Sequence, residues 1–497
     1  MEKTKFIFAI LILCAVVYAN SLNGGFISDD IATIRDNPNI GNLSSVHSLG
    51  DLVNWTSYKI SGLDTFAYHL SNLIIHGICS VLVFFFLSSF FGCWPGFLAT
   101  LLFACHPVHA ETVTWISGNP YSIAATLLFA SFILYRRATR ENKLRPVVYM
   151  FSILLCNPFH TNWYLGLYPL VIILYDVTYR QVKKNWKYWI PYILIVTTWF
   201  IKKSVAISDR IEILRTPTII GTNNPIYKLV YSFFAHLQLL LWPAQLTLYH
   251  EPARITQQLL FVELSALLIA LCFLPLLFKR SKELFFGLGI FVLFLAPTYS
   301  PVLISWTLAE RYLYIPSVGF FMLIAFLIKK YSQTPKAKNI VLVVIMLLVG
   351  AFSTRTIIRN QDWRDRETFW RATVKASPES CKAHNNMGDI YSIEGNLEMA
   401  AWSFKHATEL NPTYAEGFHN LAFTYTKTKQ YDKAIKYYKK SISLDPTLLQ
   451  SYQNLSAIYL SRGETGLAKK YLQEALRLAP TDADIARNIK EILNKIK

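Results

Sequence analysis

Residues 381–414 read CKAHNNMGDIYSIEGNLEMAAWSFKHATELNPTY, and the pattern of this stretch decides the fold of the C-terminal part of the chain. Prolines stand at positions 378, 412, 446 and 480, so the interval between consecutive prolines is 34 residues. In the same register, small residues recur at 388, 422 and 456 and at 400, 434 and 468, and large ones at 404, 438 and 472. Small residues let two helices approach and large ones fill the space between them, so each period predicts a pair of packed helices.

A period of 34 residues is that of the tetratricopeptide repeat. We expect repeats at about 381–414, 415–448 and 449–482, followed by a capping helix at 481–496. The segment 363–376 is expected to be a half-repeat that joins this solenoid to the preceding part of the chain. Stacked repeats form a concave face. The pattern leaves open whether that face binds a protein substrate, binds a partner or only stabilises a complex.

The first 360 residues are dominated by apolar segments. The whole chain of 497 residues is 53% apolar with a mean hydropathy of +0.31, which is typical of a polytopic membrane protein. Spans are predicted near 6–22, 70–91, 95–113, 120–136, 146–160, 163–179, 187–201, 226–242, 259–278, 284–304, 310–328 and 340–358. We therefore predict an all-α protein, with a membrane domain of about 11–12 helices at 1–360 and the repeat domain at 361–497.

Basic residues cluster between the predicted spans and indicate an orientation. Residues 1–360 carry 29 Lys and Arg against 15 Asp and Glu, whereas residues 361–497 carry 20 against 16. Clusters such as Lys3 with Lys5, 136–145 and 329–338 are expected on the cytoplasmic side. The net charge of +18 is therefore a topology signal, and no nucleic-acid partner is expected. Eleven crossings and a re-entrant segment at 226–242 place the first loop and the repeats outside the cytoplasm.

Two adjacent carboxylates, Asp29 and Asp30, follow the first span in the stretch GGFISDD at 24–30. Adjacent carboxylates at a membrane surface are costly because they repel each other and lose hydration. Two functions suit them, namely a general base and a site for a cation or a phosphate-linked group. The alternative is structural, since an aspartate at this position also suits a turn or the start of a helix.

Polar residues also stand at the outer ends of two other predicted spans. His106, His109 and Glu111 lie in HPVHAE, where the proline between the histidines interrupts a regular helical face. They suit either metal ligation or hydrogen bonding beside a carboxylate. Glu310 and Arg311 open the stretch ERYLYIPS, in which Tyr312 follows directly. An arginine here suits the phosphate of a lipid-linked substrate, and the alternative is an Arg–Glu pair that only holds helices together.

Further candidates are weaker. The predicted outer loop at 202–225 contains Lys202 and Arg210, which suit an anionic lipid headgroup or a solvated loop. The outer turn at 157–162 contains one titratable residue, His160. No C-x-x-C pair, glycine-rich phosphate loop or nucleotide fingerprint is present in the sequence, which argues against a zinc site of that kind and against a soluble nucleotide donor.

Together, the stretches FISDD with NPNI at 37–40, HPVHAETV at 106–113, ERYLYIPS at 310–317 and the repeat tail resemble one family. They are similar to the transmembrane and tetratricopeptide-repeat O-mannosyltransferases, which are GT-C glycosyltransferases, and in particular to their prokaryotic relatives. The resemblance spans nearly the whole chain. Two charged segments of the family pattern are missing, because Gly118-Asn119-Pro120-Tyr121 replaces Gly-Arg-x-Asp and 157–160 replaces a Lys-Glu pair.

The resemblance implies an inverting enzyme that moves mannose or another hexose from a polyprenyl-phosphate carrier to a Ser or Thr hydroxyl of a protein. It implies Asp29 as the general base, with Asp30 the second choice, and Arg311, Lys202 and Arg210 as contacts to the donor phosphate. His106, His109, Glu111, Glu310 and Tyr312 would support the site. No cofactor or bound metal is expected, because phosphate is a good leaving group. The use of a divalent metal ion is left open as an alternative. The partners would be the lipid-linked sugar, the acceptor protein and membrane lipid.

This resemblance also implies an integral, multi-pass protein of the plasma membrane in a prokaryote or of the endoplasmic reticulum in a eukaryote, with its site and repeats facing away from the cytoplasm. The alternative function is a non-catalytic membrane scaffold, in which a degenerate GT-C fold carries repeats that assemble partners. A transporter is disfavoured because the spans show no pair of matching halves.

Overall fold

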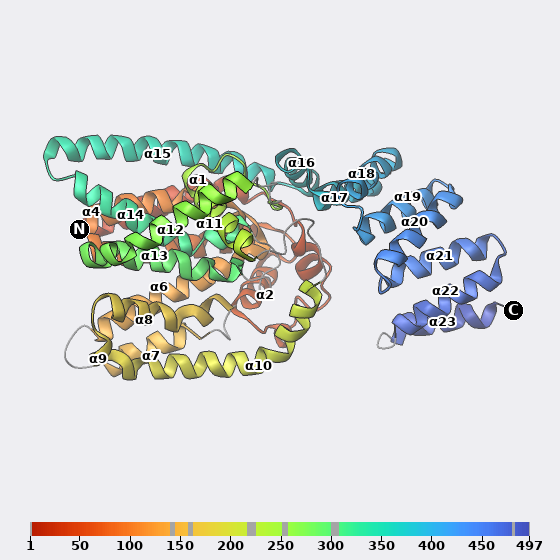
Figure 1. Ribbon diagram of the computed structural model, residues 1–497, viewed down its shortest axis with the longest axis horizontal. Coiled ribbons are helices and arrows are strands. Elements are labelled where there is room, and N and C mark those ends of the chain that lie inside the picture. Colours follow the sequence, from red (N-terminus) through yellow and green to blue (C-terminus); the bar gives the residue numbers. More distant parts are fainter. Residues whose placement is uncertain are drawn as a thin grey trace. The chain divides into compact units, whose positions relative to one another are not determined.

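The computed structural model describes residues 2–139, 145–157, 163–215, 225–250, 257–299, 308–479 and 483–496. Within these ranges every regular element is a helix, which confirms the predicted all-α class (Figure 1). Contacts divide the chain into two compact units. The membrane unit comprises Met1–Leu248 and Pro252–Phe369, and the repeat unit comprises Tyr249–Glu251 and Trp370–Lys497.

A bundle of apolar helices forms the centre of the membrane unit. Its buried core is rich in aromatic side chains such as Phe84, Phe103 and Tyr314. The helices that contribute most to it are α1 (Glu2–Tyr18), α3 (Phe66–Phe91), α4 (Cys93–Ala104), α6 (Asn119–Thr139), α14 (Pro316–Tyr331) and α15 (Pro335–Asp362). Helix α15 packs against α1 and α4. Its start is fixed by the Thr334 hydroxyl, which accepts the Ala337 N–H at 3.2 Å, and by Pro335 in the first turn.

Further helices surround this centre. They are α2 (Leu49–Ser61), α7 (Pro146–Leu155), α8 (Tyr168–Thr178), α10 (Ile190–Arg215), α11 (Pro225–Leu241), α12 (Gln257–Arg280) and α13 (Lys282–Leu295). Short turns of helix connect the central ones at the end where α1 stops, namely η4 (Pro107–His109), α5 (Ala110–Thr114), η5 (Ile116–Gly118) and η10 (Glu310–Leu313). These short turns carry five of the predicted site residues, namely His109, Glu111, Glu310, Arg311 and Tyr312.

Four helices of the described part are long and apolar enough to cross a membrane, namely Glu2–Ser21, Phe66–Phe91, Ile116–Thr139 and Pro335–Asp362. The bent pair Phe261–Leu268 and Phe273–Arg280 makes a fifth if it is one span. Shorter apolar helices cover Cys93–Ala104, Pro146–Leu155, Tyr164–Thr178 and Leu229–Leu241, at the predicted spans 95–113, 146–160, 163–179 and 226–242. The first of these predicted spans is shorter in the structure because Pro107 starts a new helical turn. The total of eleven or twelve spans stays a prediction.

Asn360, near the end of α15, ties this helix to two distant parts of the membrane unit. Its Nδ2 donates to the Val17 carbonyl and to Asn20 Oδ1, each at 2.9 Å, and its Oδ1 accepts the Thr114 hydroxyl at 2.8 Å. One buried amide thus joins α15 to the end of α1 and to α5. These contacts place the end of α15 beside the loop that carries the two aspartates.

The repeat unit is a stack of helix pairs. Its helices are α16 (Arg366–Ala376), α17 (Cys381–Ile393), α18 (Leu397–Leu410), α19 (Ala415–Lys427), α20 (Tyr431–Leu444), α21 (Leu449–Ser461), α22 (Thr465–Leu478) and α23 (Ala483–Lys495) (Figure 1). The predicted small-to-large packing is present, because a Cβ added to Gly388 would lie 2.7 Å from the Phe404 ring. Trp363 and Phe369 belong to the membrane unit, so the contacts divide the chain after Phe369, within α16, rather than at 360.

The turn inside each repeat needs a left-handed residue. Gly395, Lys429 and Gly463 stand 34 residues apart and have φ angles of 79°, 59° and 75°. Glycine takes this conformation without a steric cost, whereas lysine does not. The middle repeat therefore carries local strain that its neighbours avoid.

Candidate functional site

The two adjacent aspartates have opposite environments. Asp29 is exposed, whereas Asp30 is only 1% exposed. Ser28 just before them has a φ of 53°, a left-handed conformation that is uncommon for residues other than glycine. The sequence motif therefore contains one carboxylate that solvent can reach and one that it cannot.

Asp30 fixes the loop from inside. Its Oδ1 accepts the Ser117 hydroxyl at 2.5 Å and the Ser117 N–H at 2.8 Å, and its Oδ2 accepts the Ile27 N–H at 3.1 Å. Burial raises the pKa of Asp30 from 3.8 to about 7, and the hydrogen bonds from Ser117 and Ile27 oppose this rise. These three hydrogen bonds hold the Asp30 carboxyl against Ser117 and the backbone of Ile27.

Asp29 is held through its backbone and leaves its carboxylate at the surface. Its carbonyl accepts the Thr33 hydroxyl at 2.7 Å, and its Oδ1 lies 3.5 Å from the Ser28 hydroxyl. The longer of these is at the limit of a hydrogen bond. An exposed carboxylate on a loop that is fixed from beneath is accessible to a hydroxyl group of a substrate.

Trp115 connects this loop with the second predicted group. Its indole N–H donates to the Ile27 carbonyl at 3.3 Å, and the Arg311 guanidinium carbon lies 5.9 Å from its ring centroid. Trp115 also stacks on Trp363, with 6.0 Å between centroids. The structure thus brings the double-aspartate loop and Arg311 to one end of the helical bundle.

Arg311 forms a buried ion pair with Glu111, and not with its neighbour Glu310. Its Nη1 donates to Glu111 Oε1, and its backbone N–H donates to Glu111 Oε2 at 2.8 Å. The Arg311 side chain is 9% exposed and that of Glu111 is fully buried. Tyr312 supports the guanidinium with its ring, 5.0 Å away. Glu111 therefore fixes the direction in which the small accessible part of Arg311 points.

Glu310 has a different partner, Arg359 of α15. The Arg359 Nη2 donates to Glu310 Oε1 at 3.2 Å, and its Nη1 donates to Asp362 Oδ2 at 3.1 Å. Arg359 and Glu310 have side chains that are at most 1% exposed. Buried charges are tolerated only when they are paired in this way. The adjacent residues 310 and 311 therefore bind two different helices and hold η10 in place.

His106 and His109 are buried and make hydrogen bonds with backbone groups and, in the case of His109, also with a serine hydroxyl. The ring Nε2 of His106 lies 3.0 Å from the Leu240 carbonyl, and the ring Nδ1 of His109 lies 2.9 Å from the Phe103 carbonyl. The other nitrogen of His109 lies 3.1 Å from the Ser317 hydroxyl. Among the described residues, no group of three or more His, Cys, Asp or Glu is arranged to hold a metal ion. The described contacts of both histidines are thus hydrogen bonds and ring contacts within this chain, and their role at the site stays a prediction.

The remaining predicted residues are less informative. Lys202 is exposed on α10. The side chain of Arg210 and the residues 158–162, including His160, lie outside the described part of the chain.

Several residues of this site were not identified from the sequence. Ser117 binds Asp30, Trp115 links the loop to Arg311, and Arg359 pairs with Glu310. His76 is also buried here, with its Nδ1 2.6 Å from the Tyr314 hydroxyl. Only Arg359 leaves a sequence signal, because an arginine directly after a long apolar run needs a partner.

The comparisons with known proteins agree with this architecture. Models of the tetratricopeptide repeat match residues 382–414 and 413–481, which confirms the predicted repeats. The chain is 25% identical over 445 residues to "Protein O-mannosyl-transferase F38B6.6" of Caenorhabditis elegans, covering 81% of this chain and 62% of that protein. It is 24% identical to human "Protein O-mannosyl-transferase TMTC3", covering 80% of this chain and 50% of that protein.

A third relative is more similar over a shorter part. "Protein O-mannosyl-transferase Tmtc2" of Drosophila melanogaster is 34% identical over 151 residues, 30% of this chain and 14% of that protein. The predicted resemblance to the O-mannosyl-transferases is confirmed across about four fifths of the chain. The chain spans half to three fifths of the length of the first two relatives.

Proposed function

We propose, with the resemblance to the protein O-mannosyl-transferases as the premise, that this chain is a membrane glycosyltransferase that modifies proteins. The donor is a sugar on a polyprenyl phosphate, and the acceptor is a Ser or Thr hydroxyl. The observation that carries the proposal is the split between the two aspartates: Asp30 is buried and immobilises the loop, and Asp29 presents its carboxylate to solvent.

In the proposed reaction, the Asp29 carboxylate takes the proton of the acceptor hydroxyl. The hydroxyl oxygen attacks the anomeric carbon of the sugar from the face opposite the phosphate. The bond from that carbon to the phosphate oxygen breaks, and the phosphate leaves with the electron pair. The configuration at the anomeric carbon is therefore inverted.

Arg311 is proposed to stabilise the charge on the leaving phosphate. Its guanidinium is already paired with Glu111, so the pair as a whole carries no net charge and the phosphate would meet only the remaining donors of the fork. A preorganised, mostly buried guanidinium needs little rearrangement when charge develops. Lys202 and Arg210 are proposed to add to the positive potential for the anionic donor.

The proposed orientation is supported by the distribution of charges along the bundle. The candidate residues lie at the end where α1 and α15 stop and where α3, α6 and α14 begin. The basic residues Lys3, Arg136 and Lys329 lie at the opposite ends of their helices. Basic residues favour the cytoplasmic side, so we propose a multi-pass topology with the candidate site on the other face. The repeats would lie on that face too and recruit the acceptor.

A non-catalytic scaffold is the second candidate. It is favoured by Asn119, which replaces an arginine of the family pattern and donates to Asn54 Oδ1 at 3.1 Å, a contact with a structural role. One assay distinguishes the enzyme from the scaffold. The purified full-length chain is supplied with polyprenyl-phosphate mannose or glucose and a Ser/Thr peptide, and glycosylated peptide is measured. Transfer supports the enzyme, whereas folded protein that transfers neither sugar supports the scaffold.

A further inference from the structure

We propose that a cavity at the end of the bundle opposite the candidate site binds the phosphate of an anionic phospholipid headgroup. The cavity lies where α3, α6 and α8 end and has a volume of about 580 Å³. Three arginines line it, Arg136, Arg137 and Arg145, and all of them belong to the basic cluster at 136–145. The proposal concerns a lipid of the bilayer and does not depend on the proposed sugar transfer.

The arginines set the sign of the charge in this cavity. Among the described residues that line it, none is acidic. Two further charges beside the lining, Lys184 and the buried Asp176, attract each other and therefore offset each other. The same balance holds for Lys282 and Glu283 at the start of α13, which both lie near Tyr179. The cavity thus presents a net positive charge to an anion.

Arg136 is held at the wall of the cavity by neutral groups. Its Nη1 donates to the Ser89 hydroxyl, and its Nη2 donates to the Ser89 carbonyl at 3.2 Å. The guanidinium carbon lies 4.3 Å from the centroid of the Phe90 ring. These contacts fix the guanidinium without balancing its charge, whereas Glu111 balances that of Arg311. A guanidinium has five N–H donors, so the two that bind Ser89 leave others for a ligand.

Tyr179 adds a neutral donor to the lining. Its hydroxyl is buried, and it has no hydrogen-bond partner within the part of the chain that the structure describes. A buried polar group without a partner is costly, and a bound water, ion or ligand commonly supplies the partner. A phosphate oxygen in this cavity would be a suitable acceptor.

The apolar surroundings of the arginines favour a lipid over a free phosphate. Phe85 and Ile133 line the same cavity, and Phe85 is 38% exposed. Exposed apolar side chains continue along α3 from Phe85 to Ile78 and Ile74, at helical spacing. A phospholipid places its phosphate next to its acyl chains, so one molecule would occupy both the basic cavity and the apolar helix face.

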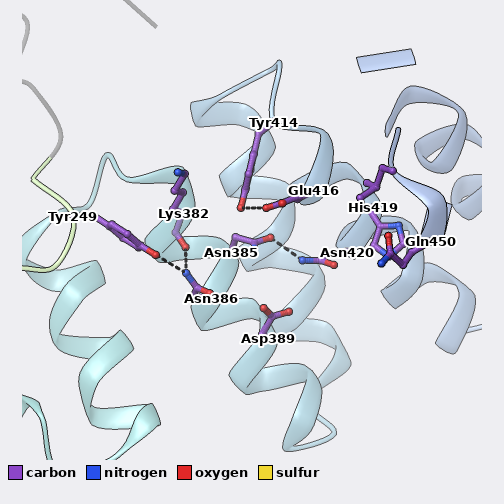
Figure 2. A pocket seen from close by; sticks show the side chains of 11 residues that line it. Tyr249, Lys382, Asn385, Asn386, Asp389, Tyr414, Glu416, His419, Asn420 and Gln450 are labelled. Carbon is purple, nitrogen blue, oxygen red and sulfur yellow. Dashed lines mark hydrogen bonds between the residues drawn. The ribbon is translucent and has the colours of Figure 1, made fainter. Parts of the chain in front are cut away.

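The proposed orientation puts this cavity at the cytoplasmic leaflet. Anionic lipids are enriched in that leaflet, and basic pockets between membrane helices on that side suit their headgroups. The cavity of the repeat unit differs in charge, because Lys382 stands there with Asp389 and Glu416 (Figure 2). One lysine against two carboxylates gives no attraction for a phosphate. Of the two cavities, the one in the membrane unit is the basic one.

Arg136 has a structural role as well, which decides the choice of variants. The Ser89 carbonyl is among the last carbonyls of α3, so Arg136 also caps that helix. Arg137 and Arg145 are exposed, and the test therefore changes these two residues and leaves Arg136 in place.

The test measures lipid binding to the full-length chain in detergent by native mass spectrometry. The probes are dioleoylphosphatidylglycerol and dioleoylphosphatidylcholine, which share their acyl chains and the phosphate but differ in net charge. We expect phosphatidylglycerol to bind more tightly. The Arg137→Gln/Arg145→Gln double variant should bind it about 10- to 30-fold more weakly, or roughly three- to fivefold for each arginine, with an unchanged unfolding midpoint.

Two control variants and a competitor keep the result interpretable. Lys279→Gln/Arg280→Gln removes the same charge from the exposed last turn of α12, outside the lining, and should leave lipid binding unchanged. Arg137→Lys/Arg145→Lys keeps the charge and should keep most of the binding. An excess of inorganic phosphate should displace little of the lipid. Equal binding of the two lipids, displacement by inorganic phosphate, or equal weakening in the two Gln variants would overturn the proposal.

Discussion

The end of the helical bundle and the cavity of the repeats treat polar groups in opposite ways. Glu111, Arg311, Glu310 and Arg359 are almost completely buried and pair with one another, whereas Asn386 and Asn420 are partly exposed and line a cavity of the repeat unit. Fixed charges suit a site that positions reacting groups, because nothing has to reorganise during the reaction. The two regions therefore differ in how they hold polar groups, because the end of the bundle buries them in pairs and the cavity of the repeats leaves them partly exposed.

The largest expected effect comes from breaking a buried ion pair. Glu111→Ala leaves Arg311 buried without its partner and should lower stability by about 3–5 kcal/mol. Arg311→Lys should also be less stable than the wild type, because lysine lacks the planar fork that reaches both the carboxylate and the aromatic rings. The measurement is the unfolding midpoint in detergent. The Glu111→Leu/Arg311→Met double variant should cost less than the two single changes summed, and strict additivity would contradict the pairing.

Asp30 should make stability depend on pH. Its pKa is raised from 3.8 to about 7, so between about pH 4 and 7 the unfolded chain releases a proton that the folded chain keeps. Stability should therefore fall as the pH rises across this window, by on the order of 4 kcal/mol, and stay level above it. Asp30→Asn should lack this part of the slope. Identical slopes in both proteins would show that Asp30 titrates as an ordinary aspartate.

A change inside the repeat unit should affect recruitment without touching the bundle. A Cβ at Gly388 would lie 2.7 Å from the Phe404 ring, so Gly388→Val should destabilise the repeats by about 1–3 kcal/mol. Gly466→Val is the matched control, because a Cβ there meets nothing within 4 Å. Protease sensitivity of the repeats and sugar transfer to a small hydroxyl acceptor are measured together. If Gly388→Val also abolished sugar transfer to the small hydroxyl acceptor, the repeat unit and the membrane unit would not work independently.

The smallest expected effect is a gain. Lys429 adopts a φ of 59° at the turn where the neighbouring repeats have Gly395 and Gly463. Lys429→Gly should therefore raise the stability of the repeat unit by about 1 kcal/mol. Lys436→Gly, at an exposed position in the interior of α20, should instead lower it by a similar amount. A lower unfolding midpoint in Lys429→Gly would show that the lysine contributes more than its strain costs.

The repeats were predictable because their packing is local and periodic: position 388 meets 404, and the same offset returns in each period. The pairings at the candidate site were not, because the partners lie far apart in the sequence. Arg311 pairs with Glu111, 200 positions away, while its neighbour Glu310 pairs with Arg359. The structure contains Arg–Glu pairs at this site, but the adjacency of Glu310 and Arg311 does not indicate their partners.

The double aspartate shows the same limit on a smaller scale. The sequence identifies the motif, and the resemblance ranks Asp29 before Asp30, but neither indicates that the two carboxyl groups have different environments. Burial beside Ser117, which is 87 residues away, distinguishes them. Only the three-dimensional arrangement separates the residue that holds the loop from the one that faces solvent.

The most direct test compares three aspartates of this loop region in one transfer assay, with polyprenyl-phosphate sugar as donor and a Ser/Thr peptide as acceptor. Asp29→Asn removes the proposed base and should lower the transfer rate about 10²- to 10⁴-fold with an unchanged unfolding midpoint. Asp36→Asn, an exposed aspartate paired with Arg35, should leave the rate near wild type. Asp30→Asn should alter stability more than Asp29→Asn does. A wild-type rate in Asp29→Asn would contradict the assignment of the base and, with it, the proposed division of roles between the two carboxylates.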